Sequence, residues 1–176
     1  MKSYKHLFFD LDHTLWDYDT NASETLFELY DKYDLAKLGV EGAAKFRDIF
    51  FRENNKLWAE MDAGRIDKFY LRNNRFRIVL TKAQADMSAV TESFLKDINH
   101  FFLTVCSKKT QVIKGAFELL DYCRGKYDLH IITNGFEEVQ ATKLAHSGLD
   151  VYFGQVITSE RAGHKKPNPG IYHYAL

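Results

Sequence analysis

The spacing of hydrophobic positions changes twice along this chain. Lys5–Leu11 is a short and almost continuously apolar run, which is typical of a buried strand. From about residue 20 to residue 104 the apolar residues follow a helical spacing, and after Ser107 short apolar runs alternate with amphipathic stretches. The pattern therefore predicts one strand, then a long helical insertion, and then an alternating α/β segment.

Four helices are expected in the insertion. The first is predicted from Asn21 to about Tyr33, because Asn21 followed by Glu24 is the spacing of a capping box. The other three are expected over about 41–61, 68–80 and 83–104. The phenylalanines of these helices are predicted to fill the insertion's core, with a base-stacking wall as the alternative. The arginine group Arg72, Arg75 and Arg77 is predicted to lie on a solvated face.

The last third of the chain predicts a parallel sheet. Helices are expected over 114–126, over 137–147 and from Asn168 onwards, and strands over 129–133 and 151–157. Such alternation is typical of a parallel sheet with helices on both faces. In sheets of this kind ligands bind outside the carboxyl ends of the strands, so functional residues are expected there.

Composition narrows the choice of partners. Lys and Arg total 24 residues and Asp and Glu also total 24, which leaves no basic excess for a nucleic-acid polymer or an anionic membrane. The short basic start is followed at once by acids, which argues against a signal peptide. Cys106 and Cys123 form no CxxC pair and are expected to be reduced, packed thiols, which favours a cytoplasmic protein.

Asp10 and Asp12 stand one residue apart where the first strand ends. Two carboxylates this close repel each other, so either one keeps its proton or a divalent cation compensates both. Mg²⁺ is the expected cation, because it takes oxygen ligands and binds few protein groups together with water and phosphate.

The other strand ends offer groups that bind anions. Thr133 and Asn134 follow the second expected strand, and Lys166 lies in the loop after the third. A hydroxyl, a backbone N–H and an ammonium group can together hold a phosphate. Such a cradle beside a carboxylate and a metal points to phosphoryl transfer, in which a carboxylate can also be the nucleophile.

Three motifs carry a family resemblance. Asp10-Leu11-Asp12-His13-Thr14 resembles the DxDxT motif of the haloacid dehalogenase-like (HAD) phosphatases, Ile131–Gly135 resembles their second motif, and His164–Pro169 resembles their third. The insertion is similar to their helical cap. The resemblance implies a Rossmann-like α/β HAD core made of residues 1–18 and 105–176, with a helical cap over 19–104.

The resemblance also implies roles. Asp10 would attack phosphorus, while Asp12 would protonate the leaving oxygen and later deprotonate a water molecule. Mg²⁺ would be held by the Asp10 side chain and the Asp12 backbone carbonyl. Thr133 and the Asn134 amide would bind the phosphate, and Lys166 would neutralise it.

The expected activity is that of a Mg²⁺-dependent phosphomonoesterase acting on a small phosphate ester. Trp16 with Asp17 is similar to the branch that dephosphorylates pyrimidine nucleoside monophosphates. The first alternative is an enzyme with the same chemistry and another substrate, either a phosphatase of sugar phosphates or phosphoglycolate, or a phosphomutase. The second acid, Asp12, argues against the dehalogenases proper, which lack it. A receiver-type phosphoacceptor is disfavoured because its acid lies on a middle strand.

Two further histidines are given structural roles. His13 is expected in a turn, and His130 is expected to be a hydrogen-bonded histidine of the core.

A fourth acidic motif of the family is not found after Lys166. The natural protein is therefore expected to continue past Leu176 by roughly one or two more strand–helix pairs, which would also cover the apolar edge of the first strand. Without them the metal site would be incomplete, and an inactive scaffold would be the alternative. The oligomeric state cannot be read from the sequence.

Overall fold

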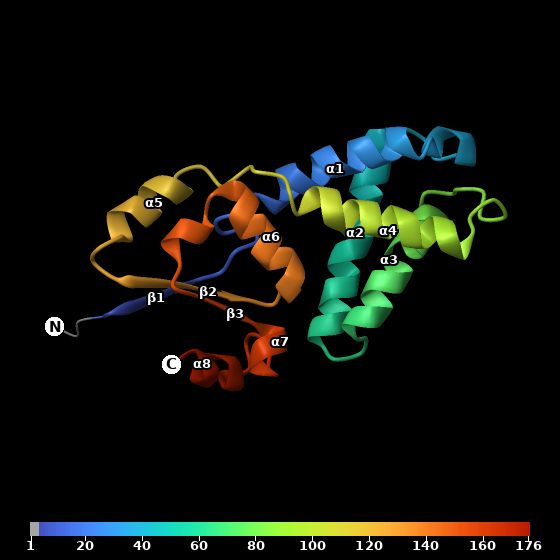
Figure 1. Ribbon diagram of the computed structural model, residues 1–176. Helices are drawn as coiled ribbons and strands as arrows, with labels where there is room; N and C mark the ends of the chain where they lie inside the picture. Colours follow the sequence, from blue (N-terminus) through green and yellow to red (C-terminus); the bar gives the residue numbers. More distant parts are fainter. Residues whose placement is uncertain (1–3) are drawn as a thin grey trace. The chain divides into compact units, whose positions relative to one another are not determined.

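The computed structural model describes residues 4–176, and these residues form two compact units. The first unit joins the N-terminal segment up to Asn21 with Ser107–Leu176, and the second is Ala22–Cys106. Figure 1 labels the helices and strands of both units. Their assignment as the core and cap domains, with the limits given above, stays a prediction.

The first unit is built on a three-stranded parallel sheet. Its strands are β1 (His6–Phe9), β2 (Asp128–Thr133) and β3 (Gln155–Thr158), in the order β1-β2-β3. Phe8 lies opposite His130, and His130 lies opposite Gln155. Among the described residues β1 thus has a neighbouring strand on one side only, and β2 is central.

Helices flank this sheet on both sides, as Figure 1 shows. On one side lie α5 (Ala116–Cys123) and α6 (Glu137–Ser147), and on the other lie α7 (Ser159–Ala162) and α8 (Pro169–Ala175). Successive residues of a strand face opposite sides of the sheet. Ile132 and Ile157 accordingly pack with Ile171 of α8, and the predicted α/β class with a parallel sheet is confirmed.

The second unit is entirely helical. It contains most of α1 (Tyr18–Lys32), a 3₁₀ turn η1 (Leu35–Leu38), α2 (Ala43–Asp62), α3 (Lys68–Lys82) and α4 (Glu92–Cys106). The predicted helical insertion after the first strand is therefore confirmed, although α4 begins later than the expected residue 83.

Phenylalanines from three helices meet in the core of this unit. Phe50 of α2 has its ring centroid 5.6 Å from that of Phe76 of α3 and 4.8 Å from that of Phe102 of α4. The guanidinium of Arg75 lies 4.8 Å from the Phe102 centroid and donates to Asn99 Oδ1 at 3.0 Å. The prediction of a solvated face was wrong for Arg75, which is buried because aromatic rings and a side-chain amide receive its charge.

Two local predictions were also wrong. The first helix begins at Tyr18 because Asp17 caps it, accepting from the Thr20 N–H at 3.0 Å, so Asn21 lies inside the helix and forms no capping box. The strand expected over 151–157 begins only at Gln155, since Asp150–Tyr152 forms a 3₁₀ turn, η2.

Both cysteines, Cys106 and Cys123, are buried, as expected for packed thiols. Among the described residues no helix is both long and apolar enough to cross a membrane.

Candidate active site

A tight loop after β1 presents the two acids. The main-chain N–H groups of Leu15 and Trp16 both donate to the Leu11 carbonyl at 2.9 Å, and the His13 N–H donates to the Trp16 carbonyl at 3.0 Å. His13 has a left-handed backbone, with φ of 61°, so it lies in a turn as predicted. The chain thus folds back on itself immediately after the strand, and Asp10 and Asp12 stay at its carboxyl end.

Asp10 is held through one of its two carboxylate oxygens. Its Oδ1 accepts from the Leu11 N–H at 2.8 Å and lies 2.9 Å from Lys166 Nζ. The structure gives Oδ2 no such contact with the described residues, and the side chain is 43% exposed. Asp10 therefore has a fixed orientation and one oxygen still available to a ligand.

Asn134 fixes the main chain of Lys166. Its Oδ1 accepts from the Lys166 N–H at 2.8 Å, and its Nδ2 donates to the Lys166 carbonyl at 3.1 Å. This two-point contact ties the end of β2 to the loop between α7 and α8. The Asn134 side chain is thus occupied in placing Lys166, so the predicted phosphate contact of Asn134 would come from its backbone amide.

The Thr133 hydroxyl is buried and accepts two hydrogen bonds. The Gly135 N–H donates to it at 3.0 Å and Gln140 Nε2 donates at 2.8 Å. A hydroxyl has two acceptor lone pairs and one O–H. Because both lone pairs are used, the Thr133 O–H is the group that remains to donate to an anion.

Asp12 is held by α6 on both of its carboxylate oxygens. Lys143 Nζ lies 2.6 Å from Oδ1, and Gln140 Nε2 donates to Oδ2 at 2.9 Å. The sequence interpretation missed Lys143 and Gln140. The sequence does contain a signal for them. Positions 140, 143, 144 and 147 form the inward face of a predicted helix, and three of these four residues are polar.

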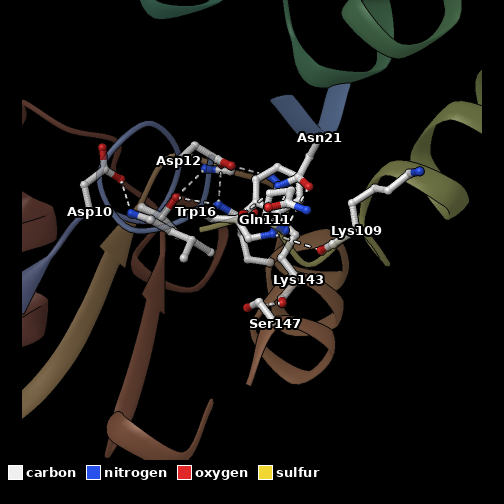
Figure 2. A network of polar contacts seen from close by, with 12 residues as sticks. Asp10, Asp12, Trp16, Asn21, Lys109, Gln111, Lys143 and Ser147 are labelled. Carbon is white, nitrogen blue, oxygen red and sulfur yellow. Dashed lines mark hydrogen bonds and ion pairs between the residues drawn. The ribbon is translucent and has the colours of Figure 1, made fainter. Parts of the chain in front are cut away.

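Figure 2 shows the surroundings of Lys143. Its ammonium group lies 4.4 Å from the ring centroid of Trp16, whose indole N–H donates to the Lys109 carbonyl at 3.2 Å. Asn21 exchanges hydrogen bonds with the main chain of Gln111 at 2.8 and 3.1 Å. The segments leading into and out of the helical insertion are thus tied together beside Asp12.

The oxygen donors of this site suit a magnesium ion that also binds phosphate. Asp10 Oδ2 and the main-chain carbonyl of Asp12 are donors of the kind Mg²⁺ prefers, and this ion is usually held by one or two protein oxygens with water and phosphate. Residues 4–176 contain no group of three or more His, Cys, Asp or Glu side chains placed to hold a metal. The donors therefore fit a shared site better than an all-protein cage.

His130 lies away from this site and packs in the core. Its Nε2 is 3.1 Å from His6 Nδ1, and its ring stacks on Phe8, which confirms the predicted hydrogen-bonded core histidine. Burial, followed by the nearby His6, lowers the pKa of His130, and Asp128 opposes them in part.

The parallel α/β unit with a long helical insertion after its first strand defines a known class of hydrolase. Residues 4–176 match the family described as haloacid dehalogenase-like hydrolase, and the chain belongs to this family. The resemblance drawn from the three motifs is thus confirmed, and the protein is an enzyme of the hydrolase class.

Curated relatives are similar over nearly the whole chain. It is 35% identical over 170 residues to the pyrimidine 5'-nucleotidase PynA of Streptococcus pneumoniae, a match that covers 96% of this chain and 67% of PynA. It is 30% identical over 170 residues to the pyrimidine 5'-nucleotidase YjjG of Escherichia coli, covering 97% of this chain and 69% of YjjG. The chain spans about two thirds of the length of these relatives.

Solved structures show the same fold. A crystal structure of YfnB from Bacillus subtilis bound to magnesium superposes with a TM-score of 0.81 at 25% identity, covering 99% of this chain and 72% of that one. The defluorinating L-2-haloacid dehalogenase Rha0230 superposes with a TM-score of 0.74 at 15% identity, covering 98% of this chain and 67% of that one.

Proposed function

We propose that this protein is a Mg²⁺-dependent phosphomonoesterase that acts through an aspartyl-phosphate on Asp10. The observation that carries the proposal is the contact of Lys166 Nζ with Asp10 Oδ1 at 2.9 Å, with the other Asp10 oxygen still available. A nucleophile for phosphoryl transfer needs an accessible oxygen atom. It also needs an adjacent cation that neutralises the negative charge of the phosphoryl group. Asp10 and Lys166 meet both requirements.

The reaction would use the remaining groups in two steps. Asp10 attacks phosphorus as the ester bond breaks, and Asp12 gives its proton to the leaving oxygen. Water then attacks the same phosphorus, Asp12 takes the proton of that water, and the bond between Asp10 and phosphorus breaks. The Thr133 O–H, the Asn134 backbone amide and the Lys166 ammonium would hold the phosphoryl oxygens throughout, since catalysis of phosphoryl transfer depends mainly on positioning and charge neutralisation.

The Asp10 side chain and the Asp12 main-chain carbonyl would hold Mg²⁺. Bound there, the ion would supply positive charge that lets two acids and a phosphate share one site. The two Asp12 carboxylate oxygens already accept from Lys143 and Gln140, which supports ligation through the backbone rather than the side chain.

The substrate proposed is a pyrimidine nucleoside 5'-monophosphate. Support comes from the similarity to PynA and YjjG, which are both named pyrimidine 5'-nucleotidases. Trp16 and Asp17 of the motif are structural here, because Trp16 is buried and Asp17 caps α1, so neither carries the choice of base directly. The two buried cysteine thiols support a cytoplasmic reaction as part of the same proposal.

A panel of phosphate esters tests this function. Phosphate release is measured with the protein at its natural full length, using pyrimidine and purine nucleoside monophosphates, a sugar phosphate and phosphoglycolate, each with Mg²⁺ and with EDTA. We expect release to be fastest from a pyrimidine nucleotide and to be abolished by EDTA. Faster phosphate release from phosphoglycolate or from the sugar phosphate would contradict the proposed pyrimidine nucleotide substrate. Phosphate release unaffected by EDTA would contradict the Mg²⁺-dependent mechanism.

A further inference from the structure

We infer that Lys143 is a positioning residue for the hydrolytic half of the reaction, because it holds the Asp12 carboxylate where that group takes a proton from water. This inference rests on the proposed function. It assigns a role to a lysine outside the three motifs that indicated the site.

The geometry around Asp12 supports a positioning role. Lys143 reaches Oδ1 and Gln140 reaches Oδ2, both from α6, at 2.6 and 2.9 Å. Two donors on different oxygens prevent the carboxylate from rotating about its own bond, whereas a single donor would leave that rotation free. A proton transfer needs a donor and acceptor at hydrogen-bond distance, so fixing this rotation matters for the rate.

Lys143 can position Asp12 because it is itself immobilised. Its side chain is only 6% exposed, and its ammonium lies over the ring of Trp16, which is fully buried. The Ser147 hydroxyl donates to the Lys143 main-chain carbonyl at 2.7 Å. A supporting residue is effective when its own conformation is locked by packing in this way.

The two lysines of the site have separate partners. Lys166 contacts Asp10, and Lys143 contacts Asp12. Lys143 therefore acts through Asp12 rather than on the phosphoryl group. During hydrolysis the water oxygen bonds to phosphorus, the water proton passes to Asp12, and the bond from phosphorus to Asp10 breaks. A displaced Asp12 therefore slows hydrolysis of the aspartyl-phosphate. Formation of the aspartyl-phosphate from an ester with a good leaving group is affected less, because such a group leaves without a proton from Asp12.

Rapid-mixing kinetics with p-nitrophenyl phosphate separates the two steps in the full-length protein. We expect Lys143→Met to leave the first-turnover release of p-nitrophenol within about threefold of the unmodified protein and to slow steady-state turnover by about ten- to a hundredfold, the effect of a small misplacement. A burst of close to one product per active site then appears, with the phosphoryl group retained on the protein. Lys143→Arg keeps the charge and the donors and is expected to restore most of the turnover.

The matched control is Lys126→Met. Lys126 also lies over an aromatic ring, that of Tyr122 at 3.3 Å, but it contacts no acid of the site, so its kinetics should not change. If Lys143→Met does not fold, Lys143→Gln gives the same comparison. Equal slowing of both phases, or no slowing of either, would overturn the inference. Absence of any p-nitrophenol release from the unmodified protein would instead contradict the proposed function.

Discussion

Asp12 and Lys143 form an ion pair of 2.6 Å in which the lysine is almost entirely buried. Asp10, two residues earlier, pairs with a different lysine, Lys166, at 2.9 Å. The two acids at the end of β1 are thus compensated separately by cations from different parts of the chain. This arrangement explains how carboxylates one residue apart are tolerated, because each has its own opposite charge within hydrogen-bond distance.

Gly135→Ala should damage the site through Gln140. A Cβ at position 135 would lie 2.2 Å from Gln140 Nε2, which is buried and bonded to both Asp12 and Thr133. Because Gln140 is fully buried and its Cδ and Cγ would also lie within 2.4 and 2.9 Å of the added Cβ, we expect a loss of about 1–3 kcal/mol in the free energy of unfolding, as for overpacking, together with reduced phosphate release. Urea unfolding and a phosphate assay measure the two effects.

Gly154→Ala is the matched control for that change. The nearest atom to its added Cβ, on His130, is at 3.7 Å, an ordinary contact distance. Unfolding and activity should therefore stay close to those of the unmodified protein. An undamaged Gly135→Ala variant would show that Gln140 does not need its present position.

Asn134→Ala should weaken the placement of Lys166. The variant removes both hydrogen bonds to the Lys166 main chain, each worth about 0.5–1.5 kcal/mol to stability. Since the Lys166 ammonium would then be less well fixed against the phosphate, we expect KM to rise more than kcat falls. Steady-state kinetics tests this, with Asn74→Ala, a partly exposed amide in α3, as the control. An unchanged KM would contradict a placing role for Asn134.

His130 should make stability depend on pH. Its pKa is lowered in the folded protein from the ordinary value of 6.5, so at mildly acid pH the unfolded chain binds more protons than the folded one. The stabilising contribution is therefore complete above about pH 6.5 and is lost as the pH falls through the folded pKa. We expect His130→Phe to flatten the fall in unfolding free energy between about pH 7.5 and pH 5 relative to the unmodified protein. Parallel curves for the two proteins would contradict this.

Asp10→Asn should abolish hydrolysis and leave the fold intact. The amide cannot act as the nucleophile, and we expect phosphate release to fall by at least about a thousandfold. Thermal unfolding should remain cooperative, because Asp10 is partly exposed and its Leu11 contact can be kept by the amide oxygen. Asp128→Asn, at the opposite end of the strands, is the control and should keep its activity.

Much of the fold could be predicted because it depends on local patterns. The helix over Glu137–Ser147 was predicted with its observed limits, since acids at its start and Gly148 at its end mark both boundaries. The strand expected from Val151 was misplaced because an apolar run does not distinguish a strand from a short 3₁₀ turn. The burial of Arg75 depends on rings from three helices, and no local pattern records such a contact.

Part of the candidate site could also be predicted from local sequence patterns. Asp10, Asp12, Thr133 and Asn134 lie at or just after strand ends, and Lys166 lies in the segment that returns to the same edge after β3 and α7. A parallel sheet brings such strand ends together. Lys143 and Gln140 reach the site from the side of a helix, more than 120 residues from Asp12 in sequence. Only the three-dimensional contact distinguishes them from ordinary solvated residues.

The most direct test is to locate the phosphoryl group during turnover. The full-length protein is mixed with a nucleoside monophosphate and Mg²⁺, quenched in acid, and digested for mass spectrometry. We predict a phosphoryl group on the peptide that contains Asp10, and none in the Asp10→Asn variant. Hydrolysis with the phosphoryl group on another residue, or unchanged hydrolysis by Asp10→Asn, would contradict the central claim.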